Sequence, residues 1–395
     1  MVRGVVEGFY GRPFTGGRRA ELIRHLSALD EPAYLYAPKN DPFHRIRWRE
    51  ESPPELVEEL RRDMELAAGT GVRFIYGISP WGFRDYEHSL LSRKAENALR
   101  LGASGIAVLF DDIPQPVDGG LAERQLRLAT SALEGFDCPV YLCPTVYCGE
   151  LLDRYDGGEY LRGWRQNMPG GWMSFWTGDA VVSRELYGPS LDRAADLLGC
   201  RPVIWDNLLA DDYCLRRIYL ADLKDRMHGD HEYFLNPPEC FPVALYGLYR
   251  MLTAAGAEPE WPGELGSFHE GWEVLGWFHD TPWSVSGDAA ALIEGIRSGM
   301  VRGPDKGTLA LLERCRGTAS RFLEELEGLA WGYELAPYVR DLSRLFGQWR
   351  EILMLASPEL RRERLDHLVF RRLPYEHPLA ALAAELNLER TGGDA

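Results

Sequence analysis

The stretch Gly105-Ile106-Ala107-Val108-Leu109-Phe110-Asp111-Asp112-Ile113 indicates the fold of this chain. Apolar residues follow a glycine, some of them are β-branched, and Pro114 comes directly afterwards. Such a run predicts a strand that is buried on both faces, which is typical of a parallel sheet. The run ends on two adjacent acids, Asp111 and Asp112, which mark a candidate site at the end of this strand.

Asp111 and Asp112 favour acid–base chemistry. A carboxylate loses solvation at the mouth of a packed strand, and two neighbouring carboxylates repel each other, so we expect one of them to hold a proton near neutral pH. A protonated acid beside an ionised one can donate and accept protons in turn. Two other interpretations stay open at this point, an ordinary solvated loop and a Mg²⁺ site.

Composition and charge exclude several classes of protein. The chain has 395 residues, 45% hydrophobic and 26% charged, which predicts one large globular domain with a smaller one attached. The net charge of -16, without a basic stripe, argues against nucleic acid or an anionic membrane surface as partner. Seven cysteines without a C-x-x-C pair favour a reducing compartment over a disulfide framework. Cys138, Cys143 and Cys148 are evenly spaced, but two lie in or beside strand-like sequence, which disfavours a metal site.

The hydropathy pattern bears on location. No apolar run approaches the roughly 20 residues of a membrane span. The first predicted strand begins almost at Met1 and leaves no room for a signal peptide. We therefore expect a cytoplasmic protein.

One pattern recurs from residue 2 to about residue 257: a short apolar run, a polar loop, and a stretch in which apolar residues are spaced as on one face of a helix. Eight units of this kind in about 250 residues predict an α/β fold, a (β/α)₈ TIM barrel. A doubly wound open sheet is the competitor, but no Gly-rich phosphate loop follows the first strand. The eight predicted strands are residues 2–9, 33–37, 73–78, 105–110, 139–143, 173–176, 202–205 and 232–235.

Polar or turn-forming residues follow each run at its C-terminal side. In a barrel these positions would converge on one rim, the face where such barrels carry their chemistry. Any one of them could be turn chemistry, yet all eight runs share the feature. They are residues 7–11, 38–41, 79–81, 111–112, 144–147, 176–178, 205–207 and 236–237.

The repeated strand and helix pattern ends at about residue 258. We therefore expect a catalytic barrel over 1–257 and a smaller helical C-terminal domain over 258–395. Apolar residues at helical spacing predict a helical hairpin over about 308–356. The two stripes most simply pack on each other; a homodimer through this domain is the weaker option.

The rim motifs, taken in order, resemble glycoside hydrolase family 84, the O-GlcNAcase and β-N-acetylglucosaminidase family. The resemblance covers about two thirds of the chain and depends on the ordered set, since any single motif is weak. The motifs are Gly4 to Pro13, Tyr36-Ala37-Pro38-Lys39, Leu109 to Ile113, Cys143-Pro144-Thr145 with Tyr147-Cys148, Trp176-Thr177-Gly178, Trp205-Asp206-Asn207 and Asn236-Pro237.

The resemblance implies hydrolysis of a terminal β-linked N-acetylglucosamine (GlcNAc) with retention, using the substrate's own acetamide as nucleophile and no cofactor. By family position, Asp112 is the general acid and then the base, and Asp111 stays ionised and accepts the acetamide N–H. Tyr147 hydrogen-bonds the acetamide oxygen. Trp205 and Asn207 belong to the acetamide pocket.

The remaining matched positions are implied to bind the sugar. Asp212, Asn236 and Lys39 resemble the family's contacts to its hydroxyls, and the backbone at Gly8 would approach the ring closely. Asp212 is chosen over Asp211 by its spacing from Asn207. The expected partner is a GlcNAc-bearing glycoconjugate or glycoprotein.

Some positions depart from the family's pattern, among them Asn40, Val146 and Phe14. None removes a catalytic group, but they put the finer contacts and the specificity for the sugar's carrier in doubt. His44-Arg45 follows the pattern, and we interpret this pair as structural. Two alternatives remain: a barrel that binds N-acetylglucosamine without cleaving it, and a metal-dependent hydrolase that uses Asp111 and Asp112.

Overall fold

The computed structural model describes residues 1–15, 17–114, 116–118, 120–154, 156–186, 188–213, 217–227, 230–370 and 377–391. Within these residues eight parallel strands pair in sequence order, and β8 pairs with β1 to close a barrel. This confirms the predicted TIM barrel and excludes the open sheet. The strands are β1 (Arg3–Glu7), β2 (Pro32–Tyr36), β3 (Arg73–Ile78), β4 (Gly105–Leu109), β5 (Val140–Cys143), β6 (Met173–Trp176), β7 (Pro202–Asp206) and β8 (Tyr233–Leu235).

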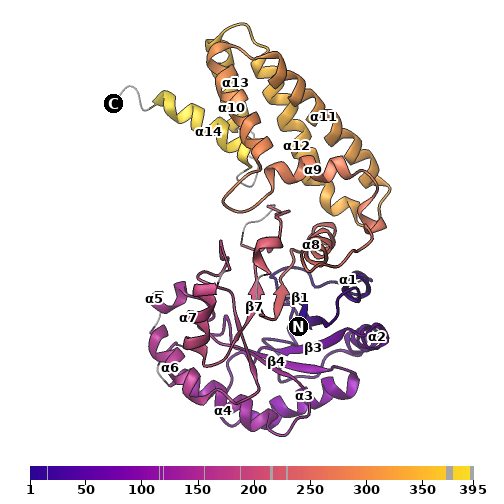
Figure 1. The fold of residues 1–395 in the computed structure, drawn as a ribbon, viewed down its shortest axis with the longest axis vertical. Helices are drawn as coiled ribbons and strands as arrows, with labels where there is room; N and C mark the ends of the chain where they lie inside the picture. The colour runs from indigo at the N-terminus through magenta and orange to yellow at the C-terminus, as the bar shows by residue number, and fades with distance from the viewer. Residues whose placement is uncertain are drawn as a thin grey trace. The chain divides into compact units, whose positions relative to one another are not determined.

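Helices connect the strands and surround the barrel (Figure 1). They form where the sequence repeats apolar residues every three or four positions, and each buries that stripe against the strands. In α4, for example, Leu121, Leu126 and Ala129 are buried. The helices are α1 (Arg18–Leu26), α2 (Pro54–Thr70), α3 (His88–Leu101), α4 (Leu121–Leu133), α5 (Glu150–Arg154), α6 (Gly157–Asn167) and α7 (Gly188–Leu198), with the short 3₁₀ helix η1 (Lys224–Arg226) before β8.

The interior of the barrel is filled by alternate residues of its strands. β4 contributes Ala107 and Leu109 to this apolar core, β5 contributes Tyr141 and Cys143, and β7 contributes Val203. The remaining residues of β4 are equally buried, because they face the surrounding helices. This is why β4 reads as a continuous apolar run instead of an alternating one.

The chain divides into two compact units. The first comprises residues 1–210, 222–239 and 247–260, and the second comprises residues 211–221, 240–246 and 261–395. Helix α8 (Phe241–Ala254) contributes residues to both. The expected domain ranges, 1–257 and 258–395, stay predictions.

The second unit is helical. Its long helices α11 and α12 lie along one another and bury the predicted apolar stripes, which include Phe322 and Trp349. Within the described part of the chain, no helix has both the length and the apolar character that crossing a membrane requires. The helices are α9 (His269–Phe278), α10 (Gly287–Arg302), α11 (Lys306–Glu327), α12 (Gly332–Leu353), α13 (Pro358–Phe370) and α14 (Pro378–Thr391), with the 3₁₀ helix η2 (Gly263–Leu265) before α9.

We expect a buried histidine to make the stability of the second unit sensitive to acid. His279 is 3% exposed, and its Nδ1 lies 3.2 Å from the carbonyl oxygen of Ile218. Burial lowers the pKa of His279 to about 4, from an ordinary value near 6.5. As pH falls below 6.5 the unfolded chain takes up a proton that the folded chain does not, so folding stability is lost between pH 6.5 and pH 4.

We expect this histidine to account for about 3 kcal/mol of unfolding free energy lost over that range. His279→Asn keeps an N–H for the carbonyl of Ile218 but cannot titrate. Urea unfolding of the two proteins at pH 7 and pH 4.5 should therefore show a smaller fall for the variant. An equal fall in both proteins would contradict the assignment.

Candidate active site

Asp111 and Asp112 lie where β4 ends, and the strand's alternation directs Asp111 to the barrel interior. Leu109 faces the core, whereas the ring of Phe110 packs edge-on against Trp164 of α6, with centroids 6.4 Å apart. Asp111 follows the parity of Leu109 and is 6% exposed. Asp112 would face the other way in a continued strand, but β4 has already ended.

Asp111 forms a buried ion pair with Lys39, which comes from the turn segment after β2. The ammonium of Lys39 donates to Asp111 Oδ2, and its side chain is 3% exposed. Burial alone would lower the pKa of Lys39, but the carboxylates of Asp111 and Asp112 outweigh it and raise that pKa. Asp111 Oδ1 is also buried, and it has no hydrogen-bond partner among the described residues. One oxygen of Asp111 is therefore held in place while the other is left to accept a hydrogen bond.

Asp112 has a left-handed backbone. Its φ is 50°, and among the described residues no other non-glycine residue has a positive φ. This conformation turns the chain sharply after β4, so that two adjacent acids do not have to point to opposite faces. The hydroxyl of Tyr10 donates to Asp112 Oδ2 at 2.9 Å, and Arg45 Nη2 donates to the Asp112 carbonyl oxygen at 2.8 Å.

Tyr147 lies close to both acids. Burial raises the pKa of its phenol, and the negative charges of Asp112 and Asp111 raise it further. Thr177 N–H donates to the Tyr147 carbonyl oxygen at 3.0 Å, which ties the loop after β5 to the loop after β6. Tyr147 is therefore a neutral hydrogen-bonding group beside the two carboxyl groups at neutral pH.

Four predicted residues at the C-terminal ends of β1, β7 and β8 form one hydrogen-bond network. Trp205 Nε1 and Asn236 Nδ2 both donate to Asn207 Oδ1 at 2.9 Å, and the Gly8 N–H donates to Asn236 Oδ1 at 3.2 Å. Asn207 Nδ2 donates in turn to the carbonyl oxygen of Val181 at 2.8 Å. The amides are thereby oriented before any substrate binds.

Trp205 links this network to the acid pair. The ammonium of Lys39 lies 5.8 Å from the centre of the Trp205 ring. A β-carbon at Gly8 would lie only 2.2 Å from Trp205 Cζ2. The absence of a side chain at Gly8 is thus already required by the tryptophan, a protein contact that sequence reasoning had not foreseen. The structure brings together all the predicted site residues except Asp212.

Asp212 belongs to the second unit and is half-buried. Its part in the site therefore stays a prediction.

Two other acids at strand ends are structural. Glu7 is fully buried and accepts hydrogen bonds from Arg19 Nε at 3.0 Å and from the hydroxyl of Tyr34 at 2.7 Å. Asp206 accepts from Arg226 Nε at 2.6 Å, and this cation outweighs burial and lowers the pKa of Asp206. A rim carboxylate with every oxygen engaged in this way holds the fold together instead of meeting a ligand.

Tyr10 and Arg45 are the contacts of Asp112 that sequence reasoning missed. Tyr10 lies inside a quoted motif but received no role, and the pair His44-Arg45 was interpreted as structural. The signal that could have found them is their type and place, since a phenol and a guanidinium follow the first two strands on the same rim as the acids.

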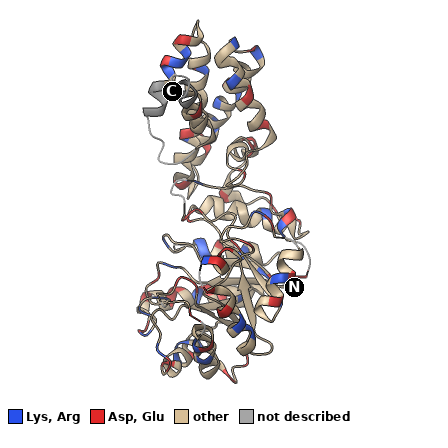
Figure 2. Cartoon of the chain, turned by 90° about the vertical axis from the view of Figure 1, so that its left-hand side faces the viewer, with Lys and Arg blue, Asp and Glu red and all other residues tan. Residues whose placement is uncertain are grey.

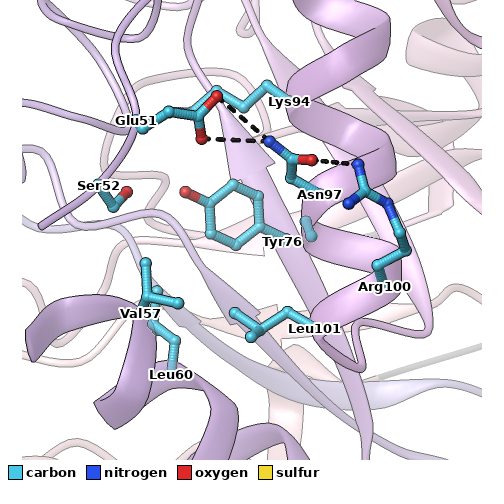
Figure 3. A pocket seen from close by; sticks show the side chains of 10 residues that line it. Glu51, Ser52, Val57, Leu60, Tyr76, Lys94, Asn97, Arg100 and Leu101 are labelled. Carbon is cyan, nitrogen blue, oxygen red and sulfur yellow. Dashed lines mark hydrogen bonds between the residues drawn. The ribbon is translucent and has the colours of Figure 1, made fainter. Parts of the chain in front are cut away.

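A separate pocket lies on the outside of the barrel between α2 and α3 (Figure 3). It measures about 290 Å³ and contains none of the predicted site residues. Several of its polar groups already have partners: Asn97 Nδ2 donates to Glu51 Oε2 at 3.1 Å, and Lys94 Nζ donates to the carbonyl oxygen of the neighbouring Glu50 at 3.0 Å. Among the described residues, no group of three or more His, Cys, Asp or Glu side chains could hold a metal ion there or elsewhere.

Comparison with known proteins agrees with this geometry. A family model described as beta-N-acetylglucosaminidase matches residues 3–239. Protein O-GlcNAcase of Mus musculus and that of Rattus norvegicus are each 35% identical over 237 residues, which cover 56% of this chain and 26% of the relative. The chain thus matches about a quarter of the length of these curated relatives.

A solved structure shares the fold. A mutant of Thermobaculum terrenum O-GlcNAc hydrolase superposes with a TM-score of 0.81 at 20% sequence identity, covering 98% of this chain and 94% of that one. The family match spans all eight strands together with Asp111, Asp112 and Tyr147. The chain therefore belongs to the β-N-acetylglucosaminidase family, as its rim motifs predicted.

Proposed function

We propose that this protein is a retaining β-N-acetylglucosaminidase that hydrolyses terminal β-linked GlcNAc through an oxazoline intermediate. The observation that carries the proposal is the state of Asp111: one oxygen is fixed by Lys39, and the other is buried and has no hydrogen-bond partner in the part of the chain that the structure describes. A buried acceptor of this kind is costly unless a ligand donates to it. The N–H of an acetamide is such a donor.

In the first step the acetamide carbonyl oxygen attacks the anomeric carbon as the glycosidic bond breaks. Asp112 gives its proton to the departing oxygen, and Asp111 accepts a hydrogen bond from the acetamide N–H and balances the charge that develops on this group. In the second step a water molecule attacks the anomeric carbon and gives a proton to Asp112, which restores the acid. The bond between the anomeric carbon and the oxazoline oxygen breaks, which regenerates the acetamide. Two displacements at one carbon give retention.

The surrounding groups are proposed to hold the acetamide in line. Tyr147 donates its hydroxyl to the acetamide oxygen, which its raised pKa allows because the phenol keeps its proton. The ring of Trp205 forms a wall of the pocket. Asn207 Nδ2 has two N–H groups and gives one to Val181, so the second can orient the acetamide.

We infer that the remaining predicted residues bind the sugar hydroxyls. Lys39 donates one N–H to Asp111 and Asn236 donates one to Asn207, and each has further N–H groups that can donate to the sugar. Asp212 would accept from the outer hydroxyls. The Gly8 backbone approaches the ring from β1.

The partner proposed for this site is a GlcNAc-bearing glycoconjugate or glycoprotein. In Figure 2 acidic residues are interspersed with basic ones along the chain, which supports a partner other than nucleic acid or an anionic membrane. We further propose a catalytic barrel over 1–257 and a helical domain over 258–395 that can mediate a homodimer. We also propose a cytoplasmic location, which the free cysteines support.

Cleavage of a chromogenic aryl β-N-acetylglucosaminide in the presence of EDTA tests the proposal. We expect the same rate with and without the chelator, because Lys39 already provides the positive charge beside Asp111. Loss of turnover with EDTA would favour a metal-dependent hydrolase. Tight binding of GlcNAc without turnover would favour a sugar-binding barrel.

A further inference from the structure

Arg45, in the turn segment that follows β2, places its guanidinium group over two aromatic rings. Its guanidinium carbon is 5.3 Å from the centre of the Tyr10 ring and 4.5 Å from the centre of the Trp81 ring. The residue is 8% exposed, and cation–π contacts strengthen when the cation is desolvated. Two aromatic contacts therefore restrict the guanidinium group.

The backbone next to Arg45 is hydrogen-bonded to the end of β3 and to the residues that follow it. Nδ1 of His44 lies 2.9 Å from the carbonyl oxygen of Gly77, and the Ser79 N–H donates to the carbonyl oxygen of His44 at 2.9 Å. Trp81 follows Ser79 by two residues. Arg45 and one of its two aromatic neighbours are thus carried by segments that are tied to each other.

From this position Arg45 reaches the backbone of Asp112. Its Nη2 donates to the Asp112 carbonyl oxygen at 2.8 Å, and Asp112 has a φ of 50°. This conformation is disfavoured for a residue with a β-carbon, so it persists only where other contacts fix it. Tyr10, which stacks on Arg45, also donates to the Asp112 carboxylate at 2.9 Å. One stack therefore holds both the peptide and the carboxyl group of Asp112.

We propose that Arg45 is a positioning residue for proton transfer, which holds the Asp112 peptide in its left-handed conformation and thereby aims the carboxyl group at the glycosidic oxygen. The inference rests on the glycosidase function proposed above. Arg45 acts through Asp112 and not by contact with the substrate. Proton transfer depends steeply on geometry, because a misplacement of about 1 Å can cost about 10²-fold in rate.

A positioning role and a purely structural role differ in their dependence on the leaving group. A misaimed acid slows the departure of an alkoxide, which needs a proton, much more than that of an activated phenolate, which needs little protonation. A general loss of folded protein would lower both rates by one common factor. The ratio of the two rates therefore separates the roles.

The experiment measures kcat/KM of Arg45→Met and Arg45→Lys with an alkyl and with a dinitrophenyl β-N-acetylglucosaminide. We expect Arg45→Met to lose about 10²-fold with the alkyl substrate and less than about 10-fold with the aryl one. Arg45→Lys should recover only part of the loss, since an ammonium lacks the planar group that stacks on Trp81. KM for the aryl substrate should stay unchanged.

Arg47→Met is the matched control. Arg47 lies two residues away and also stacks on an aromatic ring, with its guanidinium carbon 4.6 Å from the centre of Phe43, but it pairs with Glu50 instead of contacting Asp112. Its rates should match the wild type with both substrates. Should Arg45→Met fail to fold, Trp81→Leu removes one face of the stack and should show the same leaving-group preference with a smaller loss.

Two results would overturn the proposal: folded Arg45 variants that lose the same factor with both substrates, or losses no larger than that of Arg47→Met. A wild-type protein that cleaves neither substrate would instead overturn the proposed function. The two failures are therefore distinguishable.

Discussion

Asp111→Asn is expected to lose activity with every leaving group, whereas Asp112→Asn is expected to lose it mainly with poor ones. Asp111 acts on the attacking acetamide, and attack is required whatever departs, so we expect a uniform loss of about 10²- to 10³-fold. In the first step, which kcat/KM reports, Asp112 acts on the departing oxygen, so the loss in kcat/KM should reach about 10²- to 10⁴-fold for an alkyl glycoside and fall towards the wild-type value for a dinitrophenyl one. The difference is measured as kcat/KM of both variants with an alkyl glycoside and with a series of glycosides of substituted phenols.

Asp118→Asn is the matched control for both variants. Asp118 lies in the same loop between β4 and α4, is exposed, and pairs with Arg124. The same substitution there should leave all rates unchanged. Equal dependence on the leaving group in the two active-site variants would contradict the division of roles between Asp111 and Asp112.

The ion pair with Lys39 separates loss of activity from loss of stability in Asp111→Asn. This substitution leaves the Lys39 ammonium buried without its counter-charge, which typically costs about 3–5 kcal/mol. Adding Lys39→Met removes that charge and should recover much of the Tm, while activity should stay low because the acceptor for the acetamide N–H is still impaired. Recovery of activity together with Tm would show that Asp111 matters only for folding.

The barrel was predictable from sequence because its signals are local. Each strand is a short apolar run, and β3 was predicted at its observed bounds, Arg73–Ile78. Side chains alternate along a strand, so two adjacent acids can serve one site only where the strand ends. The left-handed Asp112 shows how the chain meets this requirement.

The contacts that complete the site were not predictable, because they join residues far apart in the sequence. Tyr10 and Arg45 reach Asp112 from the first and second βα loops. No periodicity encodes such a pairing. Lys39 illustrates the same point: its position matched the sugar contacts of the family, but its ion pair with Asp111 depends on where two separate loops meet.

Gly8 was predicted for a reason that the structure extends. The close approach of a sugar ring was expected to exclude a side chain, and the structure adds that the ring of Trp205 already occupies the place of a β-carbon. Residue type can therefore be read correctly from a motif while the packing that requires it comes from another strand. Asp206 stands in the same motif as Trp205 and Asn207, yet its carboxylate pairs with Arg226.

The nucleophile proposed here belongs to the substrate, so its strength can be changed without altering the protein. Fluorine on the N-acetyl group withdraws electrons from the carbonyl oxygen that attacks the anomeric carbon. If this oxygen is the nucleophile, each added fluorine raises the barrier of the first step. An enzyme carboxylate acting as nucleophile would be nearly insensitive to the change.

The most direct measurement is therefore kcat/KM for aryl glycosides that carry acetyl, monofluoroacetyl, difluoroacetyl and trifluoroacetyl groups on the sugar nitrogen. We expect a steady fall on the order of tenfold per step, equivalent to about 1.4 kcal/mol in the barrier. A rate that does not change along the series would contradict attack by the substrate's own acetamide, and with it the role of Asp111.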